Sequence, residues 1–194
     1  IFDWVIREFP SEKKILIGHS MGGQLVGLMD NHQKIDKLIL IASSTGYWRD
    51  MSSPYKWLMP PLWFLFIPIT IQIYGYVNAK TLRQGENLPK DVAIQWRNWC
   101  INPTYFDDHF QKSNTRSYFE DLRIPLKSIQ ISDDPIANEI TANKLLTYYK
   151  NAYIEVEKIS PQQLGVKKIG HAGFFSRQFS DTLWENLKID LENK

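Results

Sequence analysis

Apolar residues along the chain follow two patterns: short continuous runs and stretches with helical spacing. The runs at 13–17, 37–42 and 126–131 predict buried strands, and 153–159 is expected to form a fourth strand. Helical spacing predicts helices at 1–9, from just beyond Gly23 to Met29, at 140–150 and at 180–191. Because strands and helices alternate, the order predicts an α/β fold with a parallel sheet and helices on its faces.

An aromatic segment from about Tyr47 to Phe119 interrupts this alternation. It holds 16 of the 26 aromatic residues and five of the seven tryptophans. We therefore predict a core formed by 1–45 and 122–194, with a helical, aromatic-rich cap inserted at 46–121.

Within this insertion, Trp57 to Ala79 is a stretch of 23 residues without a charge. That is long enough for a membrane helix. Pro60, Pro61 and Pro68 are expected to break it into shorter pieces, which favours a cap buried against the sheet. The alternative is contact with a membrane surface, since Trp and Tyr at both ends are typical of an interface.

Length, charge and cysteine content narrow the class of protein. The 194 residues (22.8 kDa) suit one domain of ordinary size, and a net charge of +2 without a basic stripe disfavours nucleic-acid binding. The only cysteine, Cys100, cannot form an internal disulfide, which fits a reducing compartment such as the cytoplasm. Four scattered histidines and one cysteine make a structural zinc site improbable.

The motif Gly18-His19-Ser20-Met21-Gly22 lies between a predicted strand and a predicted helix. It fits G-x-S-x-G, in which a sharp turn projects the serine hydroxyl above a sheet. Glycines at both flanks, Gly18 and Gly22, are expected to avoid collisions with neighbouring backbone. Ser20 is therefore the candidate nucleophile.

A serine hydroxyl needs a base, and the base needs a group that orients it. Two carboxylates, Asp133 and Asp134, follow the third predicted strand, and His171 follows the fourth. The carboxyl ends of parallel strands are where such sheets collect functional side chains. The chain order therefore predicts a triad of Ser20, His171 and one of the two adjacent acids, Asp133 or Asp134.

These residues resemble the α/β-hydrolase superfamily, which places Ser, Asp and His in this order. The resemblance implies that the four strands are the fifth to eighth of eight and that the insertion is the cap. Asp134 matches the Asp-Pro-Ile turn of that superfamily better than Asp133. The segments 46–49, 96–100, 102–105 and 169–175 are similar to a narrower branch of bacterial predicted α/β-hydrolases without an assigned substrate.

The resemblance implies a serine hydrolase that cleaves an ester, thioester or amide of a small, partly apolar substrate without a cofactor or a metal. Ser20 would form the acyl-enzyme, His171 would act as base, Asp134 would orient it, and the Met21 backbone N–H would bind the oxyanion. His19 is expected to support the turn. Two alternatives remain: a non-catalytic, hydrolase-like binding module, and a lipase-like enzyme docked on a membrane through 57–79.

The first residue, Ile1, and the predicted strand order suggest that the chain is a piece of a longer protein. The family pattern places four more strands and the second oxyanion donor upstream. We expect roughly 100 further residues there, needed to complete the sheet, and weak activity of 1–194 alone.

Three other groups have simpler interpretations. His32 is expected to be a solvated helix end, and Cys100 a small buried hydrophobe in the cap. The sequence Asp107-Asp108-His109 is expected to be a polar turn rather than a metal site, since three consecutive residues cannot all face one ion.

Overall fold

The chain folds into two compact units in a computed structural model that describes residues 1–82 and 86–192. The first unit comprises Ile1–Thr45 and Arg116–Lys194, and the second comprises Gly46–Thr115. The second unit begins where the predicted insertion begins but ends before residue 121. Residues 116–121 belong to the first unit because the Phe119 ring packs against Tyr149, with 4.9 Å between ring centroids.

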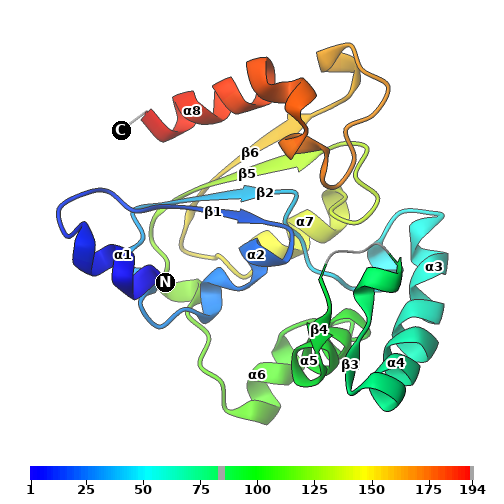
Figure 1. Ribbon diagram of the computed structural model, residues 1–194. Coiled ribbons are helices and arrows are strands. Elements are labelled where there is room, and N and C mark those ends of the chain that lie inside the picture. Colours follow the sequence, from blue (N-terminus) through cyan, green and yellow to red (C-terminus); the bar gives the residue numbers. More distant parts are fainter. Residues whose placement is uncertain (83–85, 193–194) are drawn as a thin grey trace. The chain divides into compact units, whose positions relative to one another are not determined.

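A parallel sheet of four strands forms the centre of the first unit (Figure 1). The strands are β1 (Ile15–His19), β2 (Lys37–Ile41), β5 (Pro125–Ile131) and β6 (Tyr153–Ile159). They lie in the order β1-β2-β5-β6, in register such that Leu38 pairs with both Leu16 and Leu126. The carboxyl ends of all four strands therefore point the same way, and the predicted α/β architecture is confirmed.

The helices of the first unit occur before the first strand, between the strands and after the last one. They are α1 (Phe2–Glu8), α2 (Met21–Gln24), α7 (Glu139–Leu146) and α8 (Glu185–Glu192), which continues a π-helical segment, η10 (Ser180–Trp184). Short 3₁₀ turns are η1 (Val26–Leu28), η2 (His32–Lys34), η6 (Phe119–Asp121), η7 (Gln162–Leu164), η8 (Gly173–Phe175) and η9 (Arg177–Phe179). Asn138 caps α7 by accepting a hydrogen bond from the Thr141 N–H at 3.0 Å.

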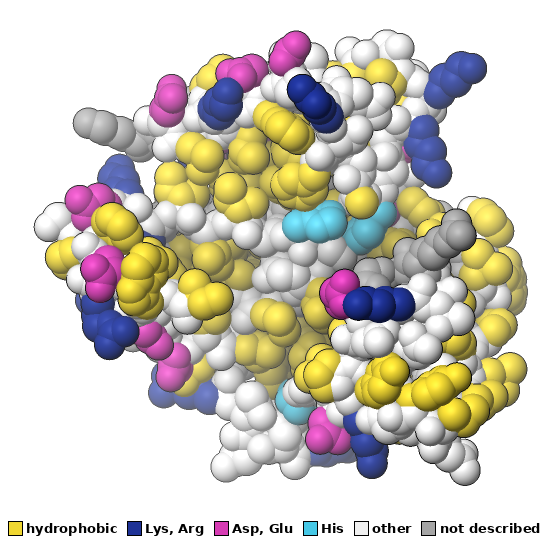
Figure 2. Space-filling model, in the orientation of Figure 1, with side chains coloured by type: hydrophobic (Ala, Val, Ile, Leu, Met, Phe, Trp, Pro, Cys, Tyr) yellow, Lys and Arg dark blue, Asp and Glu magenta, His cyan; other side chains and the backbone are white. Residues whose placement is uncertain are grey.

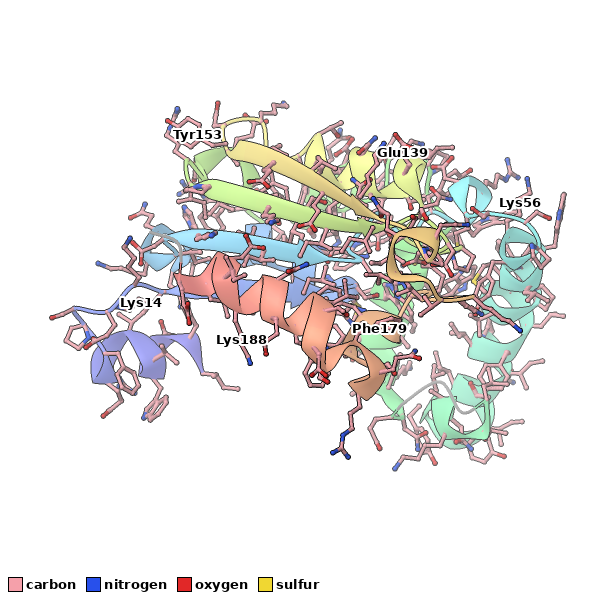
Figure 3. The ribbon with its side chains drawn as sticks, turned by 90° about the horizontal axis from the view of Figure 1, so that it is seen from above. Lys14, Lys56, Glu139, Tyr153, Phe179 and Lys188 are labelled. Atoms are coloured by element: carbon pink, nitrogen blue, oxygen red, sulfur yellow. The ribbon has the colours of Figure 1, made fainter. Side chains whose placement is uncertain are left out.

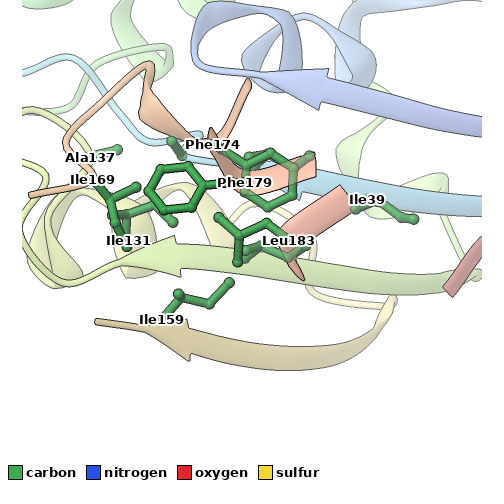
Figure 4. Packing of buried hydrophobic residues seen from close by; sticks show 11 residues of the cluster. Ile39, Ile131, Ala137, Ile159, Ile169, Phe174, Phe179 and Leu183 are labelled. Carbon is green, nitrogen blue, oxygen red and sulfur yellow. The ribbon is translucent and has the colours of Figure 1, made fainter. Parts of the chain in front are cut away.

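Helices lie on both faces of the sheet, and the central strands β2 and β5 are mostly buried, as near-continuous apolar strands require. The prediction of a buried strand at 13–17 is wrong, because β1 lies at an edge of the sheet and Ile17 is 41% exposed. Helix α8 lies over one face, and α2 and α7 lie on the other (Figures 1 and 3). Side chains alternate along β2, so that Ile39 and Ile41 join a buried cluster with Phe174, Phe179 and Leu183 (Figure 4). This cluster attaches the C-terminal segment, including the loop that carries His171, to the sheet.

The helix predicted beyond Gly23 is interrupted. A single α-helical turn, α2, is followed by the 3₁₀ turn η1, because Gly27 meets the segment around Phe119. The Gly27 carbonyl accepts a hydrogen bond from the Tyr118 N–H at 2.7 Å, and a Cβ at Gly27 would lie 2.2 Å from the Phe119 ring. This tertiary contact ends the helix earlier than the apolar spacing predicts.

The second unit is mainly helical. It contains α3 (Tyr55–Pro61), the π-helical η4 (Leu62–Phe66), α4 (Ile67–Tyr74), α5 (Lys90–Cys100) and α6 (Asp107–Ser113), with 3₁₀ turns η3 (Trp48–Asp50) and η5 (Ala79–Leu82). Strands β3 (Tyr76–Val77) and β4 (Leu88–Pro89) form a short antiparallel pair. Its core is built from large aromatic residues, including Trp63, Tyr105 and Phe106.

The segments α3, η4 and α4 form one continuous helix from Tyr55 to Tyr74, so the expectation that prolines break this stretch is wrong. Prolines lack a backbone N–H and so cannot donate within the helix. In the π-helical turn the hydrogen bonds span five residues instead of four, as in the bond from the Ile67 N–H to the carbonyl of Leu62, and the helix continues. Among the described residues, this 20-residue helix is long and apolar enough to cross a membrane. Only 17% of its most apolar window is buried, so the expectation of a buried helix is also wrong.

Candidate active site

Ser20 occupies a sharp turn between β1 and α2. Its backbone has φ 51° and ψ −122°, a conformation with positive φ that serine rarely adopts. The Ser20 N–H donates to the Ile41 carbonyl at 3.1 Å, so the turn is attached to the end of β2. Strain held in place by the neighbouring strand is typical of functional positions.

Close packing of two glycines makes this turn possible. A Cβ at Gly18 would lie 2.5 Å from the Gly23 Cα, and a Cβ at Gly23 would lie 2.3 Å from the Ser43 Oγ. A Cβ at Gly22 would meet nothing within 4 Å. The expectation that Gly22 avoids a collision is therefore wrong for this chain, and Gly23 has that role.

Two hydrogen bonds from outside the turn hold the same glycines. The Ser43 hydroxyl donates to the Gly18 carbonyl at 3.0 Å. The buried Tyr149 hydroxyl donates to the Gly23 carbonyl at 3.0 Å. The geometry at Ser20 therefore depends on β2 and on the segment after α7, as well as on the motif itself.

The glycine contacts predict opposite effects for two adjacent substitutions. We expect Gly23→Ala to lower the free energy of unfolding by about 1–3 kcal/mol, because its methyl group would overlap Ser43 and Leu40. Gly22→Ala should leave it unchanged or raise it by up to about 1 kcal/mol, since alanine is favoured in a helix and space is open. Urea unfolding of both variants measures the difference, and equal effects would contradict the packing.

His171 lies within hydrogen-bonding distance of both Ser20 and Asp134. The Ser20 Oγ is 2.8 Å from the His171 Nε2, and the His171 Nδ1 is 2.7 Å from the Asp134 Oδ2. A carboxylate can only accept, so Nδ1 carries the proton and Nε2 is left to accept from the serine hydroxyl. The structure thus brings together the three side chains that the sequence singled out.

Asp134 is itself held in position. Its side chain is 0% exposed, and its Oδ1 accepts hydrogen bonds from the N–H groups of Ile136 at 2.8 Å and Ala137 at 3.0 Å. These bonds leave Oδ2 directed at the imidazole. The His171 side chain, by contrast, retains 22% exposure.

Asp133, the alternative acid, has a different set of partners. Its two carboxylate oxygens accept from the backbone N–H groups of Ile169 at 2.9 Å and Gly170 at 3.0 Å. Gly170 has φ 68°, a conformation that glycine adopts easily. Asp133 therefore anchors the loop just before His171, and Asp134 contacts the imidazole.

His19 supports the same loop from the other side. Its Nε2 is 3.1 Å from the His171 carbonyl, which can only accept, so Nε2 carries a proton. The ring also packs edge-on against Phe175, with centroids 5.0 Å apart. Burial lowers the pKa of His19, which favours the neutral ring.

The other residues considered from the sequence have different surroundings. His32 is buried rather than solvated: it stacks on Tyr118 with ring centroids 4.7 Å apart, and its Nδ1 is 3.0 Å from the Met29 carbonyl. Cys100 is fully buried, as predicted, and burial raises the pKa of its thiol, which makes it a poor nucleophile. Asp107-Asp108-His109 forms the first turn of α6 instead of a separate loop.

Two supporting residues escaped the sequence analysis. The sequence indicates Asp133 only as the alternative acid and Tyr149 only as part of a helix. The signal for Asp133 was its position beside the acid, at the end of a strand. No local pattern distinguishes Tyr149, because its hydroxyl meets a carbonyl 126 positions away in the sequence.

Comparison with known proteins identifies the fold. No protein-family model and no curated protein matches the sequence. A monoacylglycerol lipase from Paleococcus ferrophilus superposes with a TM-score of 0.55 at 14% identity, covering 98% of this chain and 72% of that one. The esterase EaEST from Exiguobacterium antarcticum superposes with a TM-score of 0.50 at 16% identity, covering 96% and 71%.

These structural similarities show that the chain has the α/β-hydrolase fold. The resemblance inferred from the sequence is confirmed at this level. At such low identity the likeness concerns the fold alone, so the chemistry rests on the residues of this chain.

Proposed function

We propose that the protein is a serine hydrolase that transfers an acyl group from an ester, thioester or amide to water through an acyl-enzyme on Ser20. The hydrogen-bonded series Ser20–His171–Asp134 carries this proposal. A hydroxyl in contact with an imidazole whose other nitrogen is held by a buried carboxylate is the arrangement that activates serine.

In the first half of the reaction, the Ser20 Oγ attacks the substrate carbonyl carbon while His171 Nε2 accepts the hydroxyl proton. The carbonyl π electrons move to oxygen and form an oxyanion. When the carbonyl re-forms, the bond to the leaving group breaks, and Nε2 returns its proton to that group. Asp134 keeps the proton on Nδ1 and stabilises the imidazolium in between.

The second half repeats these steps with water. His171 removes a proton from water, hydroxide adds to the acyl carbon, and the proton returns to the Ser20 Oγ as the acid leaves. A serine ester is readily hydrolysed in this way. A serine nucleophile disfavours epoxide opening and halide displacement, which require a carboxylate to form an alkyl ester.

The Met21 backbone N–H is the proposed oxyanion donor. Met21 is the first residue of α2, and amides in the first turn of a helix have no partner within the helix. A donor directed at the developing negative charge typically contributes about 2.7–4 kcal/mol to lowering the barrier.

A series of p-nitrophenyl esters of increasing acyl length, assayed with the full-length protein, tests the proposal. We expect turnover with an optimum at one acyl length, and loss of turnover in Ser20→Ala. Saturable binding of the esters without turnover, in protein that is well folded by circular dichroism, would instead indicate a non-catalytic binding module.

A further inference from the structure

We propose that the outward face of the helix Tyr55–Tyr74 is a docking surface for anionic phospholipid membranes. The helix belongs to the second unit, so this inference is independent of the chemistry proposed for Ser20. The occupant is a lipid bilayer, on which the helix lies flat with its apolar side chains inserted among the lipid headgroups.

The first observation is an exposed apolar helix face, which we call the outer face. Side chains here are large and mostly uncovered: Trp57 is 65% exposed, Leu58 58%, Leu65 59%, Ile69 50% and Ile73 65%. Figure 2 shows apolar side chains gathered over this helix. An exposed apolar patch of this kind marks an interaction site.

The opposite side of the helix is already in use. Trp63, Ile67 and Thr70, spaced four and three residues apart, are buried in the second unit. The Trp63 ring packs edge-on against Trp96 of α5, with centroids 5.1 Å apart. Both sides of the helix are therefore apolar, but only one is occupied within the chain.

Charge around the outer face favours anionic lipid over other occupants. From 51 to 82 the sequence contains two lysines, Lys56 and Lys80, and no acidic residue. The Lys80 ammonium pairs with the Glu86 carboxylate at 2.7 Å, so the charge argument rests on Lys56 and Arg97. The Lys56 ammonium lies 5.4 Å from the Trp57 ring, and the Arg97 guanidinium lies 5.3 Å from the Phe64 ring. Cations seated on exposed aromatic rings are well placed to meet phosphate groups while the rings enter the interface.

The position of Arg97 argues that the helix lies on the membrane and does not span it. Arg97 Nε donates to the carbonyl of Trp63, which is near the middle of the helix. In a spanning arrangement this charge would lie near the centre of the bilayer, where charged groups are strongly disfavoured. With the helix parallel to the surface, the same guanidinium lies at the headgroup level.

Tyrosine and tryptophan at the two ends of the helix support an interfacial position. Trp57 lies near one end, and Tyr74 (52% exposed) and Tyr76 (36% exposed) lie at the other. Amphipathic aromatic rings concentrate at the membrane–water boundary because one edge is apolar and the other is polar. The outer face thus combines apolar insertion, aromatic ends and flanking cations.

Co-sedimentation of the full-length protein with vesicles tests this proposal. We expect binding to phosphatidylcholine vesicles that contain about 30% phosphatidylglycerol, and weaker binding to pure phosphatidylcholine. Raising NaCl from about 0.1 M to about 0.5 M should weaken the binding, because it screens the cations. Absence of binding to the anionic vesicles would overturn the proposal.

The double variant Leu58→Gln with Leu65→Gln should lower the vesicle partition coefficient roughly 100-fold, since burying each leucine corresponds to about a tenfold change. The matched control is Ile140→Gln with Ile189→Gln, two helical residues that are 59% and 54% exposed in the first unit. This control should bind like the parent protein. Equal losses in both double variants would contradict a specific outer face.

Two further measurements separate the remaining outcomes. Sedimentation velocity detects a dimer. If the parent is a dimer and the Leu58, Leu65 double variant is a monomer, a second copy occupies the outer face and the proposal is wrong.

If circular dichroism shows that the double variant is unfolded, Lys56→Glu replaces it. This variant should bind anionic vesicles more weakly and lose part of the salt dependence. Unchanged binding by Lys56→Glu would count against the charge argument.

Discussion

Replacing Ser20 by alanine should lower kcat/KM for ester hydrolysis by roughly 10⁵-fold, to a rate supported only by binding and oxyanion stabilisation. The reason is that the Ser20 hydroxyl is the nucleophile in contact with the His171 Nε2, at 2.8 Å. Steady-state kinetics on a p-nitrophenyl ester measure this loss. Removing one half-buried hydroxyl oxygen should leave the midpoint of thermal unfolding close to that of the parent protein.

A second serine at the carboxyl end of the sheet provides the control. Ser132 is exposed and directly precedes the two aspartates, but its side chain has no role in the proposed reaction. Ser132→Ala should retain kcat/KM within about twofold. Comparable losses in Ser20→Ala and Ser132→Ala would mean that the assay reports structural damage or a contaminant.

Asp134→Asn is expected to lower kcat by about 10⁴-fold with little change in KM. An asparagine amide next to Nδ1 would favour the wrong tautomer, with the proton on Nε2, so that the imidazole could no longer accept from Ser20. The expected loss rests on the 2.7 Å contact between His171 Nδ1 and Asp134 Oδ2. Kinetics and a thermal melt of the same variant separate catalysis from stability.

The adjacent aspartate offers a matched comparison. Asp133→Asn retains one oxygen that can accept from the His171 loop but places an amide donor opposite a backbone N–H. Unfolding free energy should fall by about 1–3 kcal/mol, with a much smaller loss of kcat than in Asp134→Asn. If Asp133→Asn had the larger kinetic effect, the assignment of the acid would be reversed.

The central strands could be predicted because burial on both faces requires a nearly continuous apolar run in the sequence. The run at 37–42 is almost wholly apolar, and in the structure β2 has side chains packed on both faces. Strand β6 has the predicted bounds, Tyr153–Ile159. The candidate site followed from the same pattern, because residues at the carboxyl ends of parallel strands must approach one another.

Features that depend on distant contacts could not be predicted. The interruption after α2 arises from Phe119, which lies far along the chain from Gly27. His32 follows polar residues that suggested a solvated end, but Tyr118 covers its ring. The role of Gly23 depends on its approach to Gly18 and Ser43, which no local spacing reveals.

The helix Tyr55–Tyr74 shows a different limit of pattern analysis. Its prolines predicted breaks because a single α-helical hydrogen-bond scheme was assumed. A π-helical turn supplies another scheme and keeps the helix continuous. Composition likewise predicted burial, whereas the outer face is exposed, because apolar residues are compatible with a protein core and with a membrane surface alike.

Covalent labelling with a fluorophosphonate, followed by peptide mapping, tests the central claim most directly. This reagent modifies a serine only when a neighbouring base activates it. In the full-length protein we expect one phosphonylated peptide, with the label on Ser20, and no label in Ser20→Ala or His171→Ala. A well-folded protein that stays unlabelled, or that carries its label on another residue, would contradict an activated serine at position 20.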